Sequence, residues 1–182
     1  MKEVIIKNNK IFENYSIIKA EKKHFDTLVD IFLEAAHWLR IKGLRQWGHF
    51  LEGYGRDDIL NSINNRTALL IVKDEIIVGT VTVQCIPDEW DKHVWKEIDL
   101  AHSIFIHRLA VTRSHSGKGL GRNIINWIER EIEFPLNKKF IKLDCVGDNR
   151  KLNDYYIING FQYMGSTEDG HSKFQKEIRK NL

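Results

Sequence analysis

The most constraining stretch of the sequence is HRLAVTRSHSGKGLGR, residues 107 to 122. Its first half is apolar and strand-like, its middle is a polar turn rich in glycine, and an amphipathic segment follows directly. A strand that passes through a glycine turn into a helix can hold a phosphate, because the turn brings backbone N–H groups close to the ligand and the helix adds its positive dipole end. The spacing of the glycines decides which kind of phosphate loop this is.

Two common phosphate loops fail on that spacing. A P-loop needs G-x-x-x-x-G-K-[ST], but here Lys118 is followed by Gly119 and no glycine stands at the earlier position. A dinucleotide fingerprint needs G-x-G-x-x-G, but Gly117, Gly119 and Gly121 are spaced G-x-G-x-G. The third candidate is an acyl-CoA loop, in which alternate glycines let successive N–H groups approach a pyrophosphate.

Hydrophobic periodicity predicts the order of the remaining elements. Apolar, β-rich runs predict strands over 15–20, 66–85 (a hairpin around Asp74 and Glu75), 102–112, 140–146, 161–166 and 172–178. Helical spacing predicts helices over 23–43, 56–64, 119–134 and 150–159, the last with Gly160 as a C-cap. Residues 87–98 lack a clean period and are predicted to form a loop. The order predicts one α/β domain with a mixed sheet.

Composition narrows the setting of such a domain. With 182 residues, 42% hydrophobic and 29% charged, the chain can bury a sizeable core. No apolar run approaches the roughly 20 residues that cross a bilayer, and the charge-broken N-terminus is a poor signal peptide, so we expect a cytoplasmic protein with no membrane partner. The net charge of +3 alternates in sign instead of clustering, which argues against a nucleic-acid partner. Cys85 and Cys145 lie in apolar runs, and we expect buried thiols and no metal site.

Residues 109–121 resemble motif A of the GNAT superfamily of N-acetyltransferases, written [RQ]-x-x-G-x-[GA]. Gly119 and Gly121 match its glycines, and the strand Leu109-Ala110-Val111 precedes them. The sequence departs from the motif at Ser116, where the family has Arg or Gln. Ser116 keeps a backbone N–H but offers no cation, and Lys118 and Arg122 are the nearby side chains that can supply one.

Residues 149–161 resemble motif B of the same family, in which an asparagine precedes a tyrosine by seven residues and Gly-Phe follows. Asn149, Tyr156, Gly160 and Phe161 match it, and helical spacing places Asn149 and Tyr156 on one face. The resemblance covers about residues 15–178 and implies a single domain over 1–182. It implies the GNAT fold, a mixed and mostly antiparallel central sheet flanked by helices, with strand 102–112 splayed from strand 140–146.

The resemblance implies acetyl-CoA as cosubstrate and an amine of a small molecule or peptide as acceptor. The backbone at Leu109 and Val111 would pair with the pantetheine arm, and the glycine loop would bind the pyrophosphate. The residues expected to bind the cofactor are Leu109, Ala110, Val111, Ser116, Gly117, Lys118, Gly119, Leu120, Gly121, Arg122, Asn149 and Tyr156.

Tyr156 matches the family's general-acid tyrosine, which protonates or hydrogen-bonds the leaving thiolate. The alternative is a packed aromatic beside Gly160 and Phe161. A base is also useful, because an amine with a pKa of about 10.4 is almost entirely protonated at neutral pH.

The family often carries a Glu or His on the strand before the loop, and His107 is the first choice here because imidazole titrates in the useful range. Period-two alternation places it on one face with Phe105, Leu109 and Val111. A hydrogen-bonded structural role is the alternative for His107, and Asp99, His102 and Glu34 are the other candidate bases.

The acceptor site of the family corresponds to residues 36–50 and 88–95. Four tryptophans could form an aromatic wall there, although a core role is an equal alternative for the first: Trp38, Trp47, Trp90 and Trp95. The rival function is a non-catalytic acyl-CoA-binding sensor or interaction module. Asn149 and Tyr156 favour the enzyme, whereas Ser116 favours the rival. A homodimer is compatible with either.

Overall fold

The computed structural model describes residues 4–96 and 99–178, which group into two compact units. The first unit contains the chain up to Val83 and also Arg108–Glu133, and the second contains Gln84–His107 and the chain from Phe134 onward. Strand β6 (Ser103–Val111) contributes its start to the second unit and its end to the first. Within the described ranges, no helix has the length and apolar character needed to cross a bilayer.

The first unit contains the part of an eight-stranded sheet that runs from β2 (Lys10–Phe12) to β6. Its strands are neighbours in the order β2, β3 (Tyr15–Lys19), β4 (Ala68–Lys73), β5 (Ile76–Gln84) and β6. The pairs from β2 to β5 are antiparallel. A separate two-stranded sheet pairs β1 (Ile5–Ile6) with β7 (Ile132–Glu133). The predicted hairpin is confirmed: Asp74 and Glu75 have φ of 47° and 66°, as in the tight turn whose twist matches two antiparallel strands.

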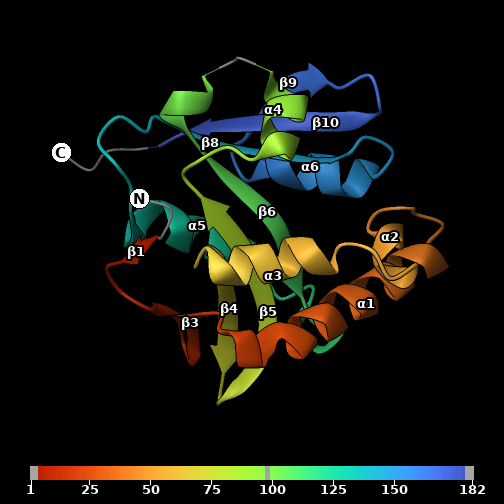
Figure 1. Cartoon of the computed structure of the whole chain (residues 1–182), viewed down its shortest axis with the longest axis vertical. Coiled ribbons are helices and arrows are strands. Elements are labelled where there is room, and N and C mark those ends of the chain that lie inside the picture. The colour runs from red at the N-terminus through yellow and green to blue at the C-terminus, as the bar shows by residue number, and fades with distance from the viewer. Residues whose placement is uncertain (1–3, 97–98, 179–182) are drawn as a thin grey trace. The chain divides into compact units, whose positions relative to one another are not determined.

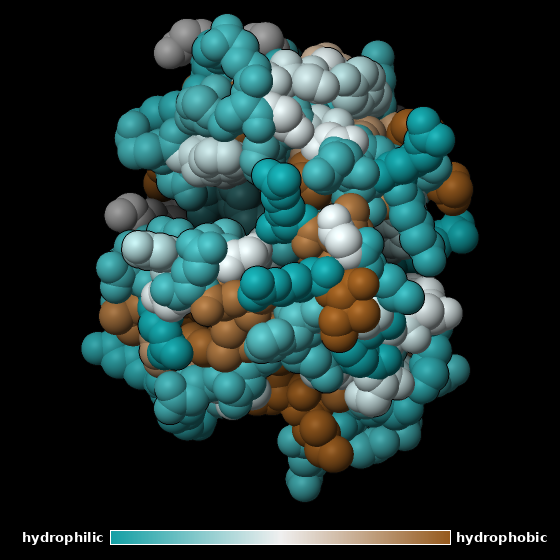
Figure 2. Space-filling view, turned by 90° about the vertical axis from the view of Figure 1, so that its right-hand side faces the viewer, coloured by the Kyte–Doolittle hydropathy of each residue, from teal (hydrophilic) through white to brown (hydrophobic). Residues whose placement is uncertain are grey.

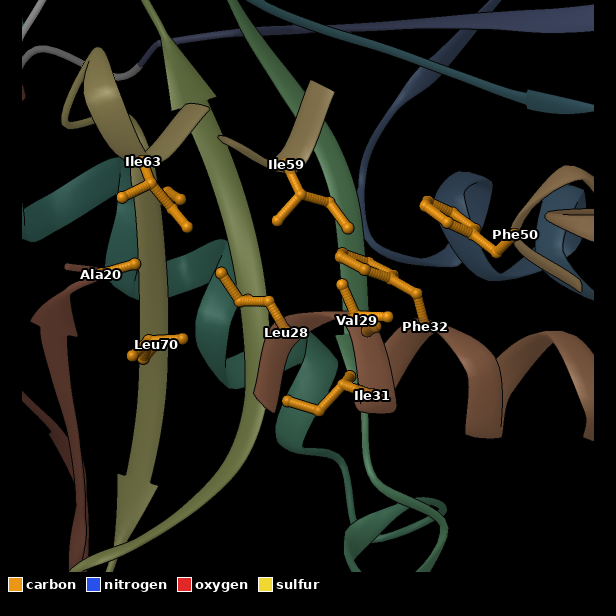
Figure 3. Packing of buried hydrophobic residues seen from close by; sticks show 11 residues of the cluster. Ala20, Leu28, Val29, Ile31, Phe32, Phe50, Ile59, Ile63 and Leu70 are labelled. Atoms are coloured by element: carbon orange, nitrogen blue, oxygen red, sulfur yellow. The ribbon is translucent and has the colours of Figure 1, made fainter. Parts of the chain in front are cut away.

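Helices cover both faces of this sheet. In Figure 1, α1 (Phe25–Ile41) and α3 (Arg56–Asn64) lie in front of β4 and β5, and α5 (Leu120–Glu131) lies behind them. Leu28 and Phe32 of α1 meet Ile59 of α3 in one hydrophobic cluster (Figure 3). The helices predicted over 23–43 and 56–64 are thus confirmed, because each carries an apolar stripe at helical spacing that the sheet can bury. The helix predicted over 119–134 is present but ends at Glu131, because Ile132–Glu133 pair as strand β7.

Further short elements of the first unit surround these helices. A 3₁₀ turn, Lys22–His24, leads into α1, and α2 (Gly48–Leu51) lies between α1 and α3 in the chain. The sequence analysis did not predict α2, because four residues are too few to show a period.

The second unit contains the remaining strands of the eight-stranded sheet. Its strands follow in the order β6, β8 (Phe140–Val146), β10 (His171–Glu177) and β9 (Gln162–Ser166). β6 and β8 are parallel but pair only at their starts, Ser103–Phe105 against Phe140–Lys142. β10 is antiparallel to both of its neighbours. The sheet is therefore mixed and mostly antiparallel, as the family resemblance predicts, and three residue pairs join β6 to β8. The predicted splay of these two strands stays a prediction.

Among its described residues, the second unit contains two α-helices. α6 (Arg150–Ile158) ends before Gly160, whose φ of +86° fits the predicted C-cap. α4 (Glu89–Trp95) lies in the segment predicted to be a loop, so that prediction was wrong. Asp88 and Asp91 form a capping box that starts α4, with each carboxylate accepting the backbone N–H of the other residue. Val94 and Trp95 then anchor the helix in a small core with Phe105.

The surface seen in Figure 2 is mostly hydrophilic, with hydrophobic residues in several patches. Large exposed hydrophobic side chains, such as those of Ile41, Tyr54 and Leu136, come from separate parts of the chain. Scattered exposure of this kind is ordinary for a folded domain.

Candidate active site

The glycine loop leaves β6 and enters α5 as the sequence predicts. Thr112 donates its N–H to the Val78 carbonyl of β5 at 2.9 Å, and a 3₁₀ turn, Arg113–His115, follows. Gly117 and Gly119 both have φ of +75°, and Gly119 is the N-cap of α5. The loop therefore delivers the backbone directly to the N-terminus of a twelve-residue helix, where the first N–H groups have no partner within the helix.

Backbone conformation, and not a lack of space for a side chain, explains the glycines at these positions. A Cβ atom added at Gly117 or Gly119 would meet nothing within 4 Å, so neither position is crowded by the protein itself. Both need glycine because side chains disfavour positive φ. Gly121 lies inside the first turn of α5.

The start of the loop is tied to α1. Glu34 accepts the Arg113 backbone N–H at 3.0 Å through Oε2, and the Arg113 guanidinium lies 3.8 Å from the centre of the Trp38 ring. Ser116 donates its hydroxyl to the Arg113 carbonyl at 2.9 Å, so the residue that replaces the family's Arg or Gln closes the turn. Glu34, one of the candidate bases, thus has a clear role in holding the loop.

The two cations considered for the loop differ in their contacts. Lys118 is exposed and donates from Nζ to the Ser114 carbonyl at 3.1 Å. Arg122 is exposed in the first turn of α5. Both are near the loop in sequence and reach solvent, as a phosphate ligand requires.

At its C-terminal end, β6 has one backbone edge that faces β5 and another that faces away from β5. Because Thr112 donates toward β5 and N–H groups alternate between the edges of a strand, the amides of Leu109 and Val111 face the other edge. Arg108 has φ of +50°, which is typical of a β-bulge. The predicted single face of His107, Leu109 and Val111 is therefore interrupted at Arg108.

Motif B forms α6 and its caps. Asn149 is the N-cap and accepts the Leu152 N–H through Oδ1 at 3.2 Å, so a helix cap accounts for this side chain locally. Gly160 and Phe161 end the helix, with the Phe161 N–H donating to the Tyr156 carbonyl at 3.1 Å. The predicted cofactor contact of Asn149 stays a prediction.

Tyr156 is the one buried residue of α6. Its ring packs against the rings of Phe161 and Phe174, with centroids 5.8 and 5.5 Å away. Burial, supported by the nearby Cys145, Tyr155 and Asp144, raises the pKa of Tyr156 above its usual value. Among the described residues, none forms a hydrogen bond with its hydroxyl. The phenol is thus neutral, packed and able to donate a hydrogen bond.

His107, the preferred base, faces a buried carboxylate. Its Nε2 lies 3.1 Å from Asp91 Oδ1, and the two side chains are 10% and 2% exposed. Gln84 at the end of β5 donates from Nε2 to Asp91 Oδ2 at 2.7 Å and lies 3.2 Å from His107 Nε2. The Asp88 N–H also donates to Asp91 Oδ2, at 3.0 Å. The imidazole is therefore held by a carboxylate that is itself held on two sides.

Electrostatics in this group follow from burial. Burial raises the pKa of Asp91, and the hydrogen bond and charge of His107 oppose that rise. One carboxylate oxygen each of Asp88 and Asp91 and one ring nitrogen of His107 lie within 4.8 Å of one another. Such a compact group is the kind of environment that perturbs titration at functional sites.

Asp99 and His102 lie in more exposed surroundings than His107. Asp99 and His102 are about half exposed, and their side chains are 4.0 Å apart. Asp99 also has φ of 53° and accepts the Ser103 hydroxyl through its carbonyl. Of the four candidates, His107 has the most enclosed site.

The tryptophans and cysteines lie in different settings. Trp47 packs against the Phe32 and Phe50 rings of the first core, and Trp95 is buried in the second unit under the Lys142 ammonium, 3.8 Å from its ring. Trp90 is 38% exposed and donates to Asp144 Oδ1 at 3.1 Å. Trp95 is therefore a core residue, and Trp47 is a partly buried residue that packs against the first core.

Cys85 and Cys145 are buried free thiols, as predicted. Burial raises the pKa of both, that of Cys145 to about 12. A high thiol pKa leaves almost no thiolate, which is the reactive form. Burial and a raised pKa thus both disfavour reaction of these two thiols.

Sequence reasoning missed Asp91 and Gln84. The signal for Asp91 was the pair Asp88-x-x-Asp91 ahead of Val94 and Trp95, which resembles a capping box before apolar residues. Nothing in the local sequence links either residue to His107, because the contact joins separate segments of the chain.

The chain is similar to acetyltransferases over most of its length. The model of the acetyltransferase (GNAT) family matches residues 28–161. YesJ of Bacillus subtilis, described as an uncharacterized N-acetyltransferase, is 35% identical over 173 residues, which are 95% of this chain and 96% of that protein.

Solved structures show the same fold. A GNAT-family acetyltransferase from Listeria monocytogenes has a TM-score of 0.74 at 26% identity, over 90% of this chain and 95% of that one. The PaiA N-acetyltransferase of Thermoplasma acidophilum, solved in complex with coenzyme A, has a TM-score of 0.68 at 16% identity, over 91% and 99% of the two chains.

Proposed function

Because the chain belongs to the acetyltransferase (GNAT) family, we propose that it transfers an acetyl group from acetyl-CoA to a primary amine of a small molecule or peptide. The observation that carries the proposal is the family match over 28–161, which includes both motifs. The amine nitrogen attacks the thioester carbonyl, the carbon–sulfur bond breaks, and CoA leaves as a thiolate. Holding both reactants on one protein makes the attack effectively unimolecular.

In this proposal the loop of the first unit binds the pyrophosphate. The left-handed Gly117 and Gly119 and the start of α5 support it, because they turn backbone N–H groups toward solvent at a helix N-terminus. Lys118 and Arg122 add positive charge. The pantetheine arm pairs with the amides of Leu109 and Val111, which face the edge of β6 away from β5.

Tyr156 assists the leaving group. Its raised pKa lies well above the value of about 8.5 typical of a thiol, so complete proton transfer to the thiolate is unfavourable. A hydrogen bond to the sulfur as charge develops is favourable, because charge-assisted hydrogen bonds are the strong ones. Tyr156 therefore acts mainly as a hydrogen-bond donor to the departing sulfur.

His107 takes the proton that the amine loses. Its support is the buried carboxylate of Asp91 at 3.1 Å, which stabilises the imidazolium that forms. A base of this kind typically accelerates a reaction by about 10²- to 10⁴-fold.

An acceptor screen tests the proposal. Purified protein is mixed with acetyl-CoA and a panel of amines (diamines and polyamines, amino acids, aminoglycosides and peptides with free N-termini), and free thiol is followed with a chromogenic disulfide. We expect acetylated product, identified by mass, with at least one class of amine. Binding of acetyl-CoA without product from any amine would contradict the proposal and favour a non-catalytic acyl-CoA-binding module.

A further inference from the structure

Asp91 is held in one orientation by its surroundings. It is 1% exposed, and its Oδ2 accepts the Gln84 amide at 2.7 Å and the Asp88 N–H at 3.0 Å. The same capping box places the Asp91 N–H 2.9 Å from Asp88 Oδ1. With Oδ2 engaged twice, Oδ1 is the oxygen directed at His107 Nε2, 3.1 Å away. The aspartate cannot rotate without giving up buried hydrogen bonds.

This orientation dictates the tautomer of His107. An ionised carboxylate only accepts hydrogen bonds, so the imidazole nitrogen that faces Asp91 Oδ1 carries a hydrogen. The Gln84 amide nitrogen has two hydrogens, and it lies closer to Asp91 Oδ2, at 2.7 Å, than to His107 Nε2, at 3.2 Å. If its second hydrogen were donated to Nε2, Asp91 Oδ1 would face a ring nitrogen without a hydrogen, so the buried carboxylate favours the hydrogen on Nε2. Neutral His107 therefore has its proton on Nε2, and Nδ1 is its basic nitrogen.

We propose that Asp91 is a positioning residue that fixes His107 as the Nε2–H tautomer, so that Nδ1 takes the proton from the acceptor amine. This proposal rests on the acetyl transfer proposed above. The nitrogen lone pair of the amine forms the new bond to carbon, its proton passes to Nδ1, and the electrons of the carbon–sulfur bond leave with the thiolate. His107 is then an imidazolium whose Nε2–H still donates to Asp91.

The arrangement stabilises the charge that forms during the reaction. Two of the titratable groups that lie against His107 are Asp91 from α4 and Asp88 at its N-cap, and both interact with it by charge. Opposite charges at such short range favour the protonated imidazole. Gln84 and the capping box keep this carboxylate in place when no substrate is bound.

The test combines ring NMR with turnover. Long-range ¹H–¹⁵N spectra report which nitrogen of each of the eight histidines carries hydrogen, and a His107→Gln spectrum assigns His107 by difference. Three further variants are compared with the parent: Asp91→Asn, Asp91→Glu as the conservative replacement, and Asp169→Asn as the matched control. Asp169 lies 3.0 Å from Nε2 of another histidine, His93, on the surface.

We expect His107 to be the Nε2–H tautomer in the parent and in Asp169→Asn. In Asp91→Asn its ring signals should change, and turnover with the best amine of the screen should fall about tenfold or more, with KM for acetyl-CoA unchanged. Asp91→Glu should restore part of the loss.

An Nδ1–H tautomer in the parent, or an Asp91→Asn variant with parental ring signals and turnover, would overturn the proposal. If no amine is acetylated, the proposed function fails, and the NMR of the parent and of Asp91→Asn still decides whether Asp91 fixes the tautomer.

Discussion

Two histidine–aspartate pairs of the second unit have almost the same length but opposite surroundings. His107 Nε2 lies 3.1 Å from Asp91, and His93 Nε2 lies 3.0 Å from Asp169. The side chains of the first pair are 10% and 2% exposed, whereas those of the second are 52% and 47% exposed. Distance therefore does not distinguish the two pairs, and burial does.

Burial changes what such a pair can do. Water and salt screen the exposed pair, which leaves it a small contributor to stability. In the buried pair the carboxylate has further hydrogen bonds from Gln84 and Asp88, so it is kept in one orientation and acts at close range in a medium of low dielectric. We therefore infer a role as catalytic base for His107 and only a surface contact for His93.

The largest expected difference between the pairs is in turnover. His107→Gln should reduce kcat/KM by about 10²- to 10⁴-fold, the range for loss of a general base. The matched variant His93→Gln should keep parental kcat/KM. The measurement is thiol release at saturating acetyl-CoA, and equal losses in the two variants would remove the distinction between the pairs.

The second difference is in folding stability. Asp91→Ala leaves the Gln84 amide and the Asp88 N–H without their acceptor, so the free energy of unfolding should fall by about 1–3 kcal/mol. Asp169→Ala should change it far less, because the carboxylate it removes is exposed. Urea unfolding followed by tryptophan fluorescence measures both. A similar cost for the two would mean that burial does not set the strength of these pairs.

Tyr156 tests whether the leaving thiolate needs a hydrogen bond in addition to the removal of the amine proton by the buried pair. Tyr156→Phe keeps the packing on Phe161 and Phe174, so stability should change by about 1 kcal/mol at most. We expect kcat to fall about tenfold or more with acetyl-CoA affinity unchanged, because the hydroxyl acts as charge develops on sulfur. Tyr155→Phe is the control on the same helix. If Tyr156→Phe keeps the parental kcat while chemistry limits the rate, Tyr156 does not assist the departure of the thiolate.

A substitution in the glycine loop should lower the affinity for acetyl-CoA without changing either histidine–aspartate pair. Gly119→Val places a β-branched side chain at φ of +75°, which costs about 1–2 kcal/mol and displaces the loop. Acetyl-CoA affinity by calorimetry should fall about tenfold, the equivalent of 1.4 kcal/mol. Gly43→Val is the matched control, because Gly43 has φ of +77° and similarly open surroundings. Unchanged affinity in a folded Gly119→Val variant would contradict the assignment of the loop.

The smallest expected effect is on the folding stability at low pH that the exposed His93–Asp169 pair contributes. Hydrogen bonds from Thr167 and His93 lower the pKa of Asp169 to about 2 from 3.8. Between these values the unfolded chain binds more protons, so this contribution to stability is present above about pH 4 and is lost as pH falls toward 2. Asp169→Asn should slightly flatten the pH dependence of the urea midpoint in that window, more so at low salt. An effect as large as that of Asp91→Ala would contradict the comparison.

The strongly periodic parts of the fold were predictable from sequence. The helix over 56–64 and the strand over 140–146 have the predicted bounds, because their apolar residues repeat at the period that the element buries. The glycines of the loop and the Gly160 cap were predictable too, since positive φ restricts the choice of residue.

The parts that were missed depend on contacts distant in sequence. α4 has seven residues, which is too short for a clear period, and a buried aspartate within it looks like a surface residue in the sequence. Asp91 and Gln84 meet His107 only through the fold. The positive φ at Arg108 has no glycine or asparagine to mark it in the sequence, so strand alternation was extended too far.

The pH profile of kcat/KM for Asp91→Asn, measured beside the parent and Asp169→Asn with the acceptor found in the screen, tests the central claim most directly. The Asp91 carboxylate stabilises protonated His107, so its removal should let the base lose its proton at lower pH. The account predicts an acidic limb displaced to lower pH and a reduced plateau in Asp91→Asn alone. A parental limb in Asp91→Asn, or the same displacement in Asp169→Asn, would contradict it.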